Sequence, residues 1–543
     1  MTKFQKREEI FETVKNNVFD LIIIGGGIVG AGTARDAALR GLKVALFEKG
    51  DFSAGTSSQS TKLIHGGLRY LKNYDFFLVR EAALERKKLI EIAPHLCDIR
   101  DFIVPNYKWS QDHILLLRLG LIGYDILSFP KNLGMHKWYN KDKIEKIEPL
   151  IKNEELRGGG IIKDVMTNDS RLVIANLQTA ATEGASIINY CIVENIIKKD
   201  ELYEVKICDL ENGDKYLVKT KVVINATGPW SDLVSKKFDE ERNNKLRLTW
   251  GAHLVLNKKT GTHPVLIVNK DGRAVFLIPH ERFDIIGTTD IDYKGDPDLI
   301  APTEFDRDYI LSSINSILPN NKYSNEDILS AFSGLRPLVL KKTDTNEGKV
   351  SRKHLIKVEQ DGIITAIGGK LTTYRLMAKE IVDKSIKLLK LNKPEHKCLT
   401  GDYPLFGGNF EYENKNTYFQ NEKIRLKNKF GIDDEVSAFI VKQLGSEVEN
   451  LDPILNKHGV KKISNNNYLL TAMVIYYIQY EFARTPIDIL RRRTWIMLEK
   501  GNGLNILDEV VDIMGLELNW DDATKNMMKK KTIDYINKFM KIT

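Results

Sequence analysis

The chain has 543 residues, of which 42% are hydrophobic, and its 81 Lys and Arg against 73 Asp and Glu give a net charge of +8. This length exceeds one ordinary hydrophobic core and the composition is that of a globular protein, so we expect several domains. No long basic run interleaved with aromatic residues appears, and the four cysteines and ten histidines show no C-x-x-C or H-E-x-x-H spacing, so the sequence predicts neither a nucleic-acid partner nor a metal site.

The first informative segment spans residues 20–48. An apolar run predicts a buried strand, a G-x-G-x-x-G spacing opens a helix at about Ile28, and a second apolar run ends at Glu48. The first glycine permits a tight turn, the second lets backbone N–H groups approach a pyrophosphate, and the third lets helix and strand pack closely; they are Gly25, Gly27 and Gly30. Glu48 is placed to bind a ribose diol, which favours NAD or FAD over NADP. A glycine-rich turn without a ligand is the alternative, and the complete strand–helix–strand–acid pattern disfavours it.

A Ser-, Thr- and Gly-rich stretch with little apolar period follows. An NAD dehydrogenase would normally continue with another βαβ unit, whereas a polar loop that can wrap a longer cofactor suits FAD. Residues 57–70 match S-S-x-S-[ST]-K-L-I-H-G-G-L-R-Y throughout. In this motif the chain resembles the FAD-dependent glycerol-3-phosphate dehydrogenases, which belong to the D-amino-acid-oxidase-like flavoprotein superfamily.

Three later segments resemble the same family and follow its order. Residues 221–232 hold an apolar strand that ends in A-T-G-x-W, residues 332–337 contain S-G-x-R-P, and residues 362–375 contain G-G-K-L-T-T-Y-R. Small residues after the first strand let the backbone pass close to a cofactor. In the family, the helix after the last motif aims its positive end at the flavin pyrimidine ring and stabilises the negative charge of the reduced form.

The resemblance implies that FAD is held without a covalent bond, with His65 lining the flavin. The residues that it places on the cofactor come from all of these motifs and from one further strand: Gly25, Gly27, Ile28, Gly30, Glu48, Lys49, Thr56, Ser57, Ser60, Thr61, Lys62, His65, Gly66, Val193, Ala226, Thr227, Gly228, Gly368, Gly369, Lys370, Leu371, Thr372 and Thr373.

The order of the segments predicts an α/β fold with interleaved domains. A Rossmann-like FAD-binding domain, discontinuous in the chain, is expected over residues 18–100, 161–235 and 361–390. Short apolar runs separated by Asn-Lys, Asp-Gly and His-Glu turns predict an antiparallel sheet, so a substrate or cap domain is expected over residues 101–160 and 236–360. Helical periods predict an all-helical C-terminal domain over residues 400–543.

Residues 484–494 predict a helix start within this last domain. Thr485 is a suitable N-cap, Pro486 suits the first helical position, and Asp488 places an acid at the third. The segment resembles the family's E-x-A-R-T-x-x-D-x-L-x-R-R-T signature. We interpret its arginine cluster as a structural ion-pair network, not as a substrate site.

The activity that the resemblance implies is oxidation of sn-glycerol 3-phosphate at carbon 2. This reaction needs a hydride acceptor at flavin N5, a base for the hydroxyl proton and a clamp for the phosphate. Arginines bind phosphate bidentately, whereas Lys370 would act as a point charge. His253 is the best candidate base because its unperturbed pKa of roughly 6.5 lies near working pH, and a strand histidine satisfied by local hydrogen bonds is the alternative. The catalytic set is His253, Arg336 and Lys370, and the substrate-binding residues implied are Arg69, Tyr70, His253, Arg336, Arg352 and Lys370.

The resemblance favours a dehydrogenase that makes dihydroxyacetone phosphate and passes its electrons to membrane quinone. A glycerophosphate oxidase that reduces O2 to H2O2 is the alternative within the family. An amine or amino-acid oxidase is disfavoured because it needs to bind only one carboxylate, and a tRNA-modifying or non-catalytic flavin module is disfavoured by the lack of a basic aromatic face. A homodimer is a further expectation for the chain.

No apolar stretch reaches the roughly 18–20 residues that a spanning helix needs, and no signal-peptide core appears at the N-terminus. The most apolar segments are residues 114–129, interrupted by Arg118 and Asp125, and residues 468–478. We therefore expect a cytoplasmic enzyme attached peripherally to the anionic inner face of the cytoplasmic membrane. Basic and apolar residues over 525–540 are one candidate contact, and a terminal helix docked on its own domain is the other interpretation.

Overall fold

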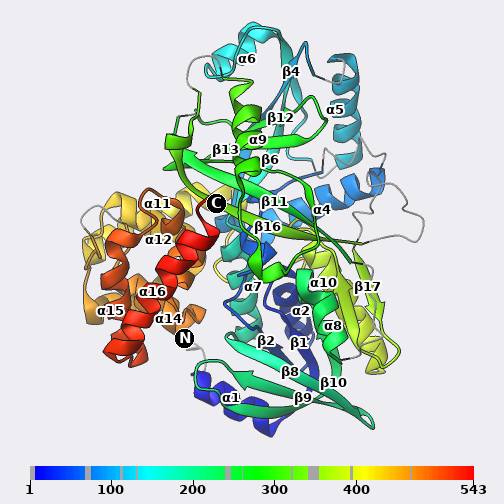
Figure 1. Cartoon of the computed structure of the whole chain (residues 1–543), viewed down its shortest axis with the longest axis vertical. Coiled ribbons are helices and arrows are strands. Elements are labelled where there is room, and N and C mark those ends of the chain that lie inside the picture. The colour runs from blue at the N-terminus through cyan, green and yellow to red at the C-terminus, as the bar shows by residue number, and fades with distance from the viewer. Residues whose placement is uncertain are drawn as a thin grey trace.

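Two β-sheets and a helical domain make up the protein in the computed structural model (Figure 1). The structure describes residues 6–67, 75–110, 114–129, 132–238, 246–259, 261–318, 322–339, 354–391, 396–464 and 468–542. The predicted substrate residues Arg69, Tyr70 and Arg352 lie outside these ranges.

The first sheet lies in the lower half of Figure 1 and has eight strands. Its main path is β17 (Leu355–Val358), β18 (Ile364–Ile367), β10 (Lys215–Asn225), β1 (Val18–Ile24), β2 (Val44–Phe47) and β7 (Ser186–Ile188), extended from β10 by β9 (Leu202–Asp209) and β8 (Cys191–Lys199). The central strands β18, β10, β1, β2 and β7 run parallel. Such strands are buried on both faces, which explains the continuous apolar run in β1.

Helices cover this parallel sheet. On one face α2 (Ile28–Leu39) packs against α7 (Asp169–Thr182) and α10 (Tyr374–Leu388). On the other face α1 (Arg7–Asn16) and the β8–β9 hairpin enclose a second cluster of buried residues. The predicted helix start at Ile28 is confirmed, and with it the Rossmann-like fold class.

The second sheet lies above the first in Figure 1 and has ten strands. Its path is β15 (Ile291–Tyr293), β11 (Leu246–Asn257), β14 (Phe283–Gly287), β13 (Ala274–Pro279), β12 (Val265–Val268), β4 (Cys97–Tyr107), β6 (Leu156–Thr167) and β3 (Leu63–Ile64), with β16 (Ile328–Val339) on β11 and β5 (Lys137–Tyr139) on β6. Its pairs are antiparallel except for β12 with β4. The expected antiparallel sheet is therefore present, and the two-residue β3 and the edge strand β17 mark places where the chain crosses between the sheets.

Four helices accompany the second sheet: α4 (Phe76–Ile92), α5 (Ile114–Ser128), α6 (Lys141–Ile147) and α9 (Glu304–Asn315). A further short helix, α8 (Ser231–Phe238), follows β10 beside the first sheet. Among the helices described, none combines the length and the apolarity required to cross a bilayer.

The helical domain forms the left side of Figure 1 and confirms the all-helical expectation. Its helices are α11 (Lys415–Phe430), α12 (Asp434–Leu444), α13 (Asp452–His458), α14 (Thr471–Glu481), α15 (Leu507–Leu518) and α16 (Asp522–Phe539). The last helix reaches back to the second sheet, where the N–H of Ala331 on β16 donates to the carbonyl of Met540 over 2.9 Å.

The predicted helix start at Thr485 is confirmed. Thr485 donates its N–H and its hydroxyl to the carboxylate of Asp488 over 2.9 and 2.7 Å, and the N–H of Asp488 donates to Thr485 Oγ1. This reciprocal cap begins a turn that continues as a π-helical segment, Asp488–Arg493.

The arginine cluster is an ion-pair network, as predicted. Arg492 and Arg493 both bind Asp51, which lies in the loop after β2, and Arg492 also binds Asp488. Burial by itself would raise the pKa of Asp51, yet the charges of Arg493 and Arg492 hold that pKa below its usual value. The network joins the helical domain to the nucleotide-binding sheet, next to the loop that follows Glu48.

Candidate active site

A cavity of about 540 Å³ lies at the carboxyl ends of β1, β2 and β10. Its wall includes the N-terminus of α2, the loop at residues 54–57, the turn at residues 226–230 and residues 368–371 before α10. The edge formed by the carboxyl ends of parallel strands is where doubly wound sheets bind dinucleotides.

Each of the three glycines of the G-x-G-x-x-G motif lies where the motif requires a residue without a side chain. Gly25 has a φ of +107°, and a Cβ there would lie 2.8 Å from the carbonyl oxygen of Ala226. A Cβ on Gly30 would lie 1.9 Å from the carbonyl oxygen of Gly25, so helix and strand could not pack as they do. At Gly27 the nearest atom is Ser57 Oγ at 3.2 Å, which leaves the backbone at the start of α2 open to a ligand. These residues fit a dinucleotide pyrophosphate.

Glu48 directly follows β2 and lines the cavity. Its carboxylate accepts the N–H groups of Gly26 over 2.6 Å and of Gly50 over 2.8 Å. Burial raises the pKa of Glu48, although the two backbone donors partly oppose the rise. Ser57 Oγ accepts the N–H of Ile28 over 2.9 Å, so the polar loop folds over the first turn of α2.

Most residues that the sequence assigns to the cofactor are brought together around this cavity: Gly25, Gly27, Ile28, Glu48, Lys49, Thr56, Ser57, Ser60, Val193, Ala226, Thr227, Gly228, Gly368, Gly369, Lys370 and Leu371. The remaining ones do not line it: Gly30, Thr61, Lys62, His65, Gly66, Thr372 and Thr373. In the polar loop after β2, Thr56, Ser57 and Ser60 therefore line the wall, whereas Thr61, Lys62, His65 and Gly66 do not.

Lys62 illustrates the second group. Its Nζ donates to both carboxylate oxygens of Asp169 over 2.7 and 2.8 Å and to the carbonyl of Ser58 over 2.9 Å, and the side chains of the ion pair are fully buried. Burial lowers the pKa of Lys62 to about 8. Lys62 thus anchors the loop on α7. Nearby, Thr372 Oγ1 donates to the carbonyl of His65 over 3.3 Å.

Several residues of the cavity wall were missed from the sequence. One group begins with the last two residues of the A-T-G-x-W motif and continues on α8, so it could have been found by extending the assignment along that motif: Pro229, Trp230, Leu233, Val234, Lys237 and Phe238. A second group flanks assigned positions: Ile24, Val29, Phe47, Gly50, Ala54, Gly55, Cys191 and Ile192. Asp298 and Pro337 come from the second sheet's part of the chain; Pro337 ends the S-G-x-R-P motif, whereas no local signal marks Asp298.

Two of the three candidate catalytic residues, His253 and Arg336, lie on the paired strands β11 and β16, and neither is among the residues that line the large cavity, whereas Lys370 lines it. His253 is opposite Phe332 and Thr249 is opposite Arg336 in the register, and facing glycines lie between the two pairs. The His253 ring stacks on Phe332 with 4.8 Å between centroids. Its Nε2 lies 2.9 Å from Oγ1 of Thr61, a residue of the motif at 57–70 that we call the flavin-loop motif. Residues opposite each other in the register share a face of the sheet, as do residues an even number apart on one strand. His253 is opposite Phe332, and Arg336 is four residues after Phe332 on β16, so His253 and Arg336 lie on the same face.

Arg336 is held in place by its second-sheet neighbours. Its guanidinium donates to Asp290 over 3.1 Å, to Thr288 Oγ1 over 3.0 Å and to the carbonyl of Thr289 over 3.2 Å. A Cβ on Gly251 would lie 2.3 Å from Arg336 Nη2, so this glycine makes the arginine's position possible. One third of the side chain stays exposed, and the guanidinium can therefore meet an anion.

The electrostatics of His253 differ from the sequence expectation. Burial lowers the pKa of His253 well below its usual value, and the charges of Arg336, Lys62 and Arg491 lower it further. The assumption of an unperturbed pKa was wrong, because only 2% of the residue is exposed and it sits among cations. The imidazole is neutral at neutral pH, the form that can accept a proton.

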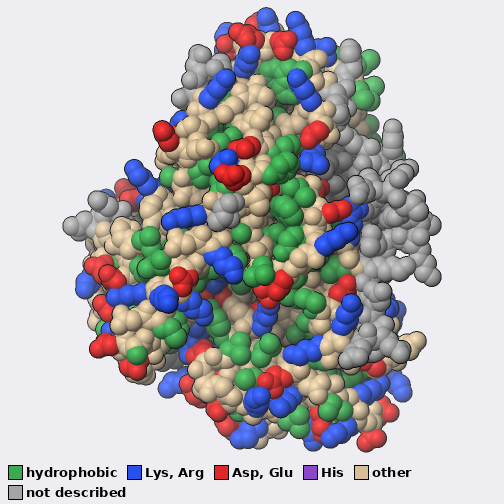
Figure 2. All heavy atoms as spheres, viewed as in Figure 1, with side chains coloured by type: hydrophobic (Ala, Val, Ile, Leu, Met, Phe, Trp, Pro, Cys, Tyr) green, Lys and Arg blue, Asp and Glu red, His purple; other side chains and the backbone are tan. Residues whose placement is uncertain are grey.

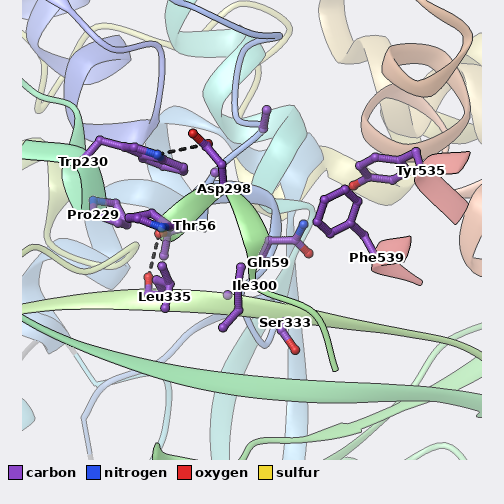
Figure 3. Close-up of a pocket in the computed structure, with 14 residues that line it drawn as sticks. Thr56, Gln59, Pro229, Trp230, Asp298, Ile300, Ser333, Leu335, Tyr535 and Phe539 are labelled. Carbon is purple, nitrogen blue, oxygen red and sulfur yellow. Dashed lines mark hydrogen bonds between the residues drawn. The ribbon is translucent and has the colours of Figure 1, made fainter. Parts of the chain in front are cut away.

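A second cavity of about 210 Å³ adjoins the first and shares part of its wall (Figure 3). Trp230 donates its indole N–H to Asp298 over 3.0 Å, and Thr56 donates its hydroxyl to the carbonyl of Leu335 over 2.7 Å. Tyr535 and Phe539 of α16 also line it and lie on the right in Figure 3, opposite Pro229 and Trp230. The C-terminal helix therefore contributes aromatic side chains next to the large cavity.

Comparisons with known proteins agree with this architecture. A family profile described as FAD dependent oxidoreductase matches residues 20–383, and one described as the C-terminal domain of alpha-glycerophosphate oxidase matches residues 398–525. The chain is 36% identical over 531 residues to an aerobic glycerol-3-phosphate dehydrogenase of Staphylococcus epidermidis, covering 96% of this chain and 94% of the relative. It is 37% identical over 528 residues to the enzyme of the same name from Staphylococcus aureus, covering 95% and 94%.

Solved structures give the same result. The glycerol-3-phosphate dehydrogenase from Bacillus halodurans, complexed with FAD, superposes with a TM-score of 0.81 at 29% identity, covering 99% of this chain and 98% of that one. The L-alpha-glycerophosphate oxidase from Mycoplasma pneumoniae, with FAD bound, superposes with a TM-score of 0.55 at 19% identity, covering 72% and 99%. At that identity the second likeness concerns the fold alone.

Proposed function

Because the chain belongs to the FAD-dependent oxidoreductase family and carries the C-terminal domain of alpha-glycerophosphate oxidase, we propose that it oxidises sn-glycerol 3-phosphate to dihydroxyacetone phosphate with FAD. The observation that carries the proposal is the similarity to aerobic glycerol-3-phosphate dehydrogenases along almost the whole of both chains. The cavity at the carboxyl ends of the parallel strands, with its glycine turn and Glu48, supports the cofactor.

Each candidate residue has a distinct task in this reaction. Bound FAD supplies a hydride acceptor at N5. Arg336, fixed by Asp290 and Thr288, offers N–H donors to the phosphate, and Lys370 on the cavity wall adds a positive charge. His253, kept neutral by burial, takes the proton of the substrate hydroxyl. Arg69, Tyr70 and Arg352 are proposed to complete the phosphate clamp.

We further propose that the electrons pass to quinone and that the enzyme works peripherally at the inner face of the cytoplasmic membrane, as a homodimer. A quinone is dissolved in lipid, so its reductase must reach the membrane surface. The alternative acceptor is O2, as in a glycerophosphate oxidase. An amine oxidase would need to bind only one carboxylate, and the positive charges of Arg336 and Lys370 are more than that task requires.

We propose that FAD is bound without a covalent link, so acid should release all of it from the protein.

Turnover of sn-glycerol 3-phosphate with a quinone analogue under anaerobic conditions, followed by peroxide measurement in air, tests the acceptor. We expect rapid quinone reduction and little peroxide, because the relatives that match almost the whole chain are named dehydrogenases and not oxidases. Rapid peroxide formation together with slow quinone reduction would instead assign the protein to the oxidases.

A further inference from the structure

Helix α5 carries an apolar side that faces away from the rest of the protein. It is hydrophobic almost all round, and a helix of this kind is normally enclosed by protein or by lipid. In the structure one side stays uncovered, with 46–71% of each residue exposed: Leu115, Leu116, Leu119, Ile122, Ile126 and Phe129. Exposed apolar patches of this size mark contact sites for a membrane or a partner.

The spacing of these residues makes the exposed side continuous. Positions 115, 119, 122, 126 and 129 repeat every three or four residues, so their side chains form one stripe along the helix. The opposite side holds Leu121, Tyr124 and Ser128, which are buried against the protein. The helix therefore has two apolar sides, and the fold uses only one of them.

Helix α4 extends the stripe at one end. Leu78 and Val79 in its first turn pack against Tyr124 and Leu127 near the end of α5. Two phenylalanines at the start of α4 are left exposed, with 49% of Phe76 and 83% of Phe77 accessible. We call the stripe on α5 together with Phe76 and Phe77 the α4/α5 surface.

The surface can be seen against the rest of the molecule. In Figure 2 hydrophobic side chains gather at the upper right edge, where Figure 1 places α5. Elsewhere on the face in view, hydrophobic, basic and acidic side chains are interspersed.

The two helices are held rigidly. Arg86 of α4 donates to Tyr124 of α5 over 2.9 Å and to Asp164 of β6 over 2.8 Å, and Asp164 also accepts the N–H of Gly66 over 3.1 Å. A Cβ on Gly66 would lie 1.9 Å from the Tyr124 hydroxyl. These bonds tie the helix pair to β6 and to the segment at Gly66, with the apolar stripe of α5 on the side that faces away from them.

We propose that the α4/α5 surface inserts into the interfacial layer of an anionic lipid bilayer. The inference gives the proposed membrane association its contact surface, and it rests on that proposal. Leu, Ile and Phe make up the surface, and these side chains suit the apolar face that an interfacial helix buries at the lipid boundary. Exposed Arg80 and Arg118 flank it, while the one acid of α5, Asp125, is buried and bonded to His136 over 2.7 Å. These two arginines and a net charge of +8 suit anionic headgroups.

The C-terminal helix is a weaker candidate for this contact. Ile536 and Met540 are almost fully buried, so that side of α16 faces its own protein. Lys525 and Lys529 form ion pairs with Asp512 and Asp508 of α15 over 3.1 and 2.7 Å. Helix α16 therefore fits the interpretation of a terminal helix docked on its own domain better than that of a membrane contact.

Flotation of the FAD-loaded protein with phosphatidylglycerol-containing vesicles at low salt tests the proposal. The double variant Leu119→Glu/Ile126→Glu should bind at least roughly ten-fold more weakly than the unaltered protein, since it places two charges in the apolar layer. Leu516→Glu on α15 is the matched control, because that leucine is 79% exposed on the helical domain, and it should bind normally. Turnover with a soluble dye acceptor should be the same in all three proteins.

A second measurement reports insertion directly. A polarity-sensitive fluorophore on Ile126→Cys should shift to the blue with vesicles, and one on Leu516→Cys should not. Equal binding by the double variant and the unaltered protein would overturn the α4/α5 surface while leaving membrane association in place. No vesicle binding by the unaltered protein would overturn both the α4/α5 surface and the proposed membrane association. A dimer that the double variant cannot form, in the absence of lipid, would show that a second copy covers the surface and would also overturn the proposal.

Discussion

Replacing Asp51 by asparagine should lower the free energy of unfolding by about 3–5 kcal/mol, the usual cost of removing one partner from a buried ion pair. The change leaves the guanidinium groups of Arg492 and Arg493 buried without their shared counter-ion. Denaturant unfolding at neutral pH and constant ionic strength, with saturating FAD, measures the effect. Because the network joins two domains, the loosened helical domain should also be cleaved faster in limited proteolysis.

The matched control is Asp101→Asn. Asp101 pairs with Lys163 over 2.9 Å, but 44% and 43% of the two side chains are exposed. Solvent screens such a pair, so its loss should change the free energy of unfolding by no more than about 1 kcal/mol. Equal and small effects of the two substitutions would show that the arginine network contributes little to holding the domains together.

Arg336→Ala should reduce kcat/KM for sn-glycerol 3-phosphate by roughly ten- to a hundred-fold, with FAD retained. Loss of a charge-assisted contact to the phosphate costs about 1.5–3 kcal/mol, and every 1.4 kcal/mol is about a factor of ten. Arg336→Lys should recover part of the activity, since it keeps the charge and loses the planar fork. Steady-state kinetics and flavin content of both variants provide the test.

Arg282→Ala serves as the control for this experiment. Arg282 has the same fractional exposure, 35% against 34%, and it pairs with Glu435 and Glu499 at the border of the helical domain. Its loss should leave kcat/KM unchanged. Kinetics of Arg336→Ala equal to those of Arg282→Ala would remove Arg336 from the phosphate site.

Features encoded in a few neighbouring residues could be predicted from the sequence. The start of α2 at Ile28 follows from the glycine spacing, and the turn at Thr485 follows from a threonine, a proline and an acid within four residues. In both cases the hydrogen bonds and contacts that fix the structure are local, so the signal lies in the segment itself.

Features that depend on residues far away in the chain could not be predicted from the sequence. Lys62 was assigned to the cofactor because it lies in the flavin-loop motif, and nothing nearby reveals Asp169, 107 positions away. β3 has only two residues, too few to show the alternation of apolar and polar residues that marks a strand. Its place in the second sheet depends on its pairing with β6. The apolar run over residues 114–129 could be recognised as too short to span a membrane, but only packing determines that one side of α5 stays exposed.

Anaerobic addition of sn-glycerol 3-phosphate to the oxidised, FAD-loaded protein tests the central proposal most directly. The visible absorbance of the flavin reports reduction without any external acceptor. We predict that one equivalent of substrate bleaches one flavin within the time of turnover, and that glycerol, which lacks the phosphate bound by Arg336 and Lys370, bleaches it far more slowly. A flavin that stays oxidised with sn-glycerol 3-phosphate, yet is bleached by glycine or another amine, would contradict the account.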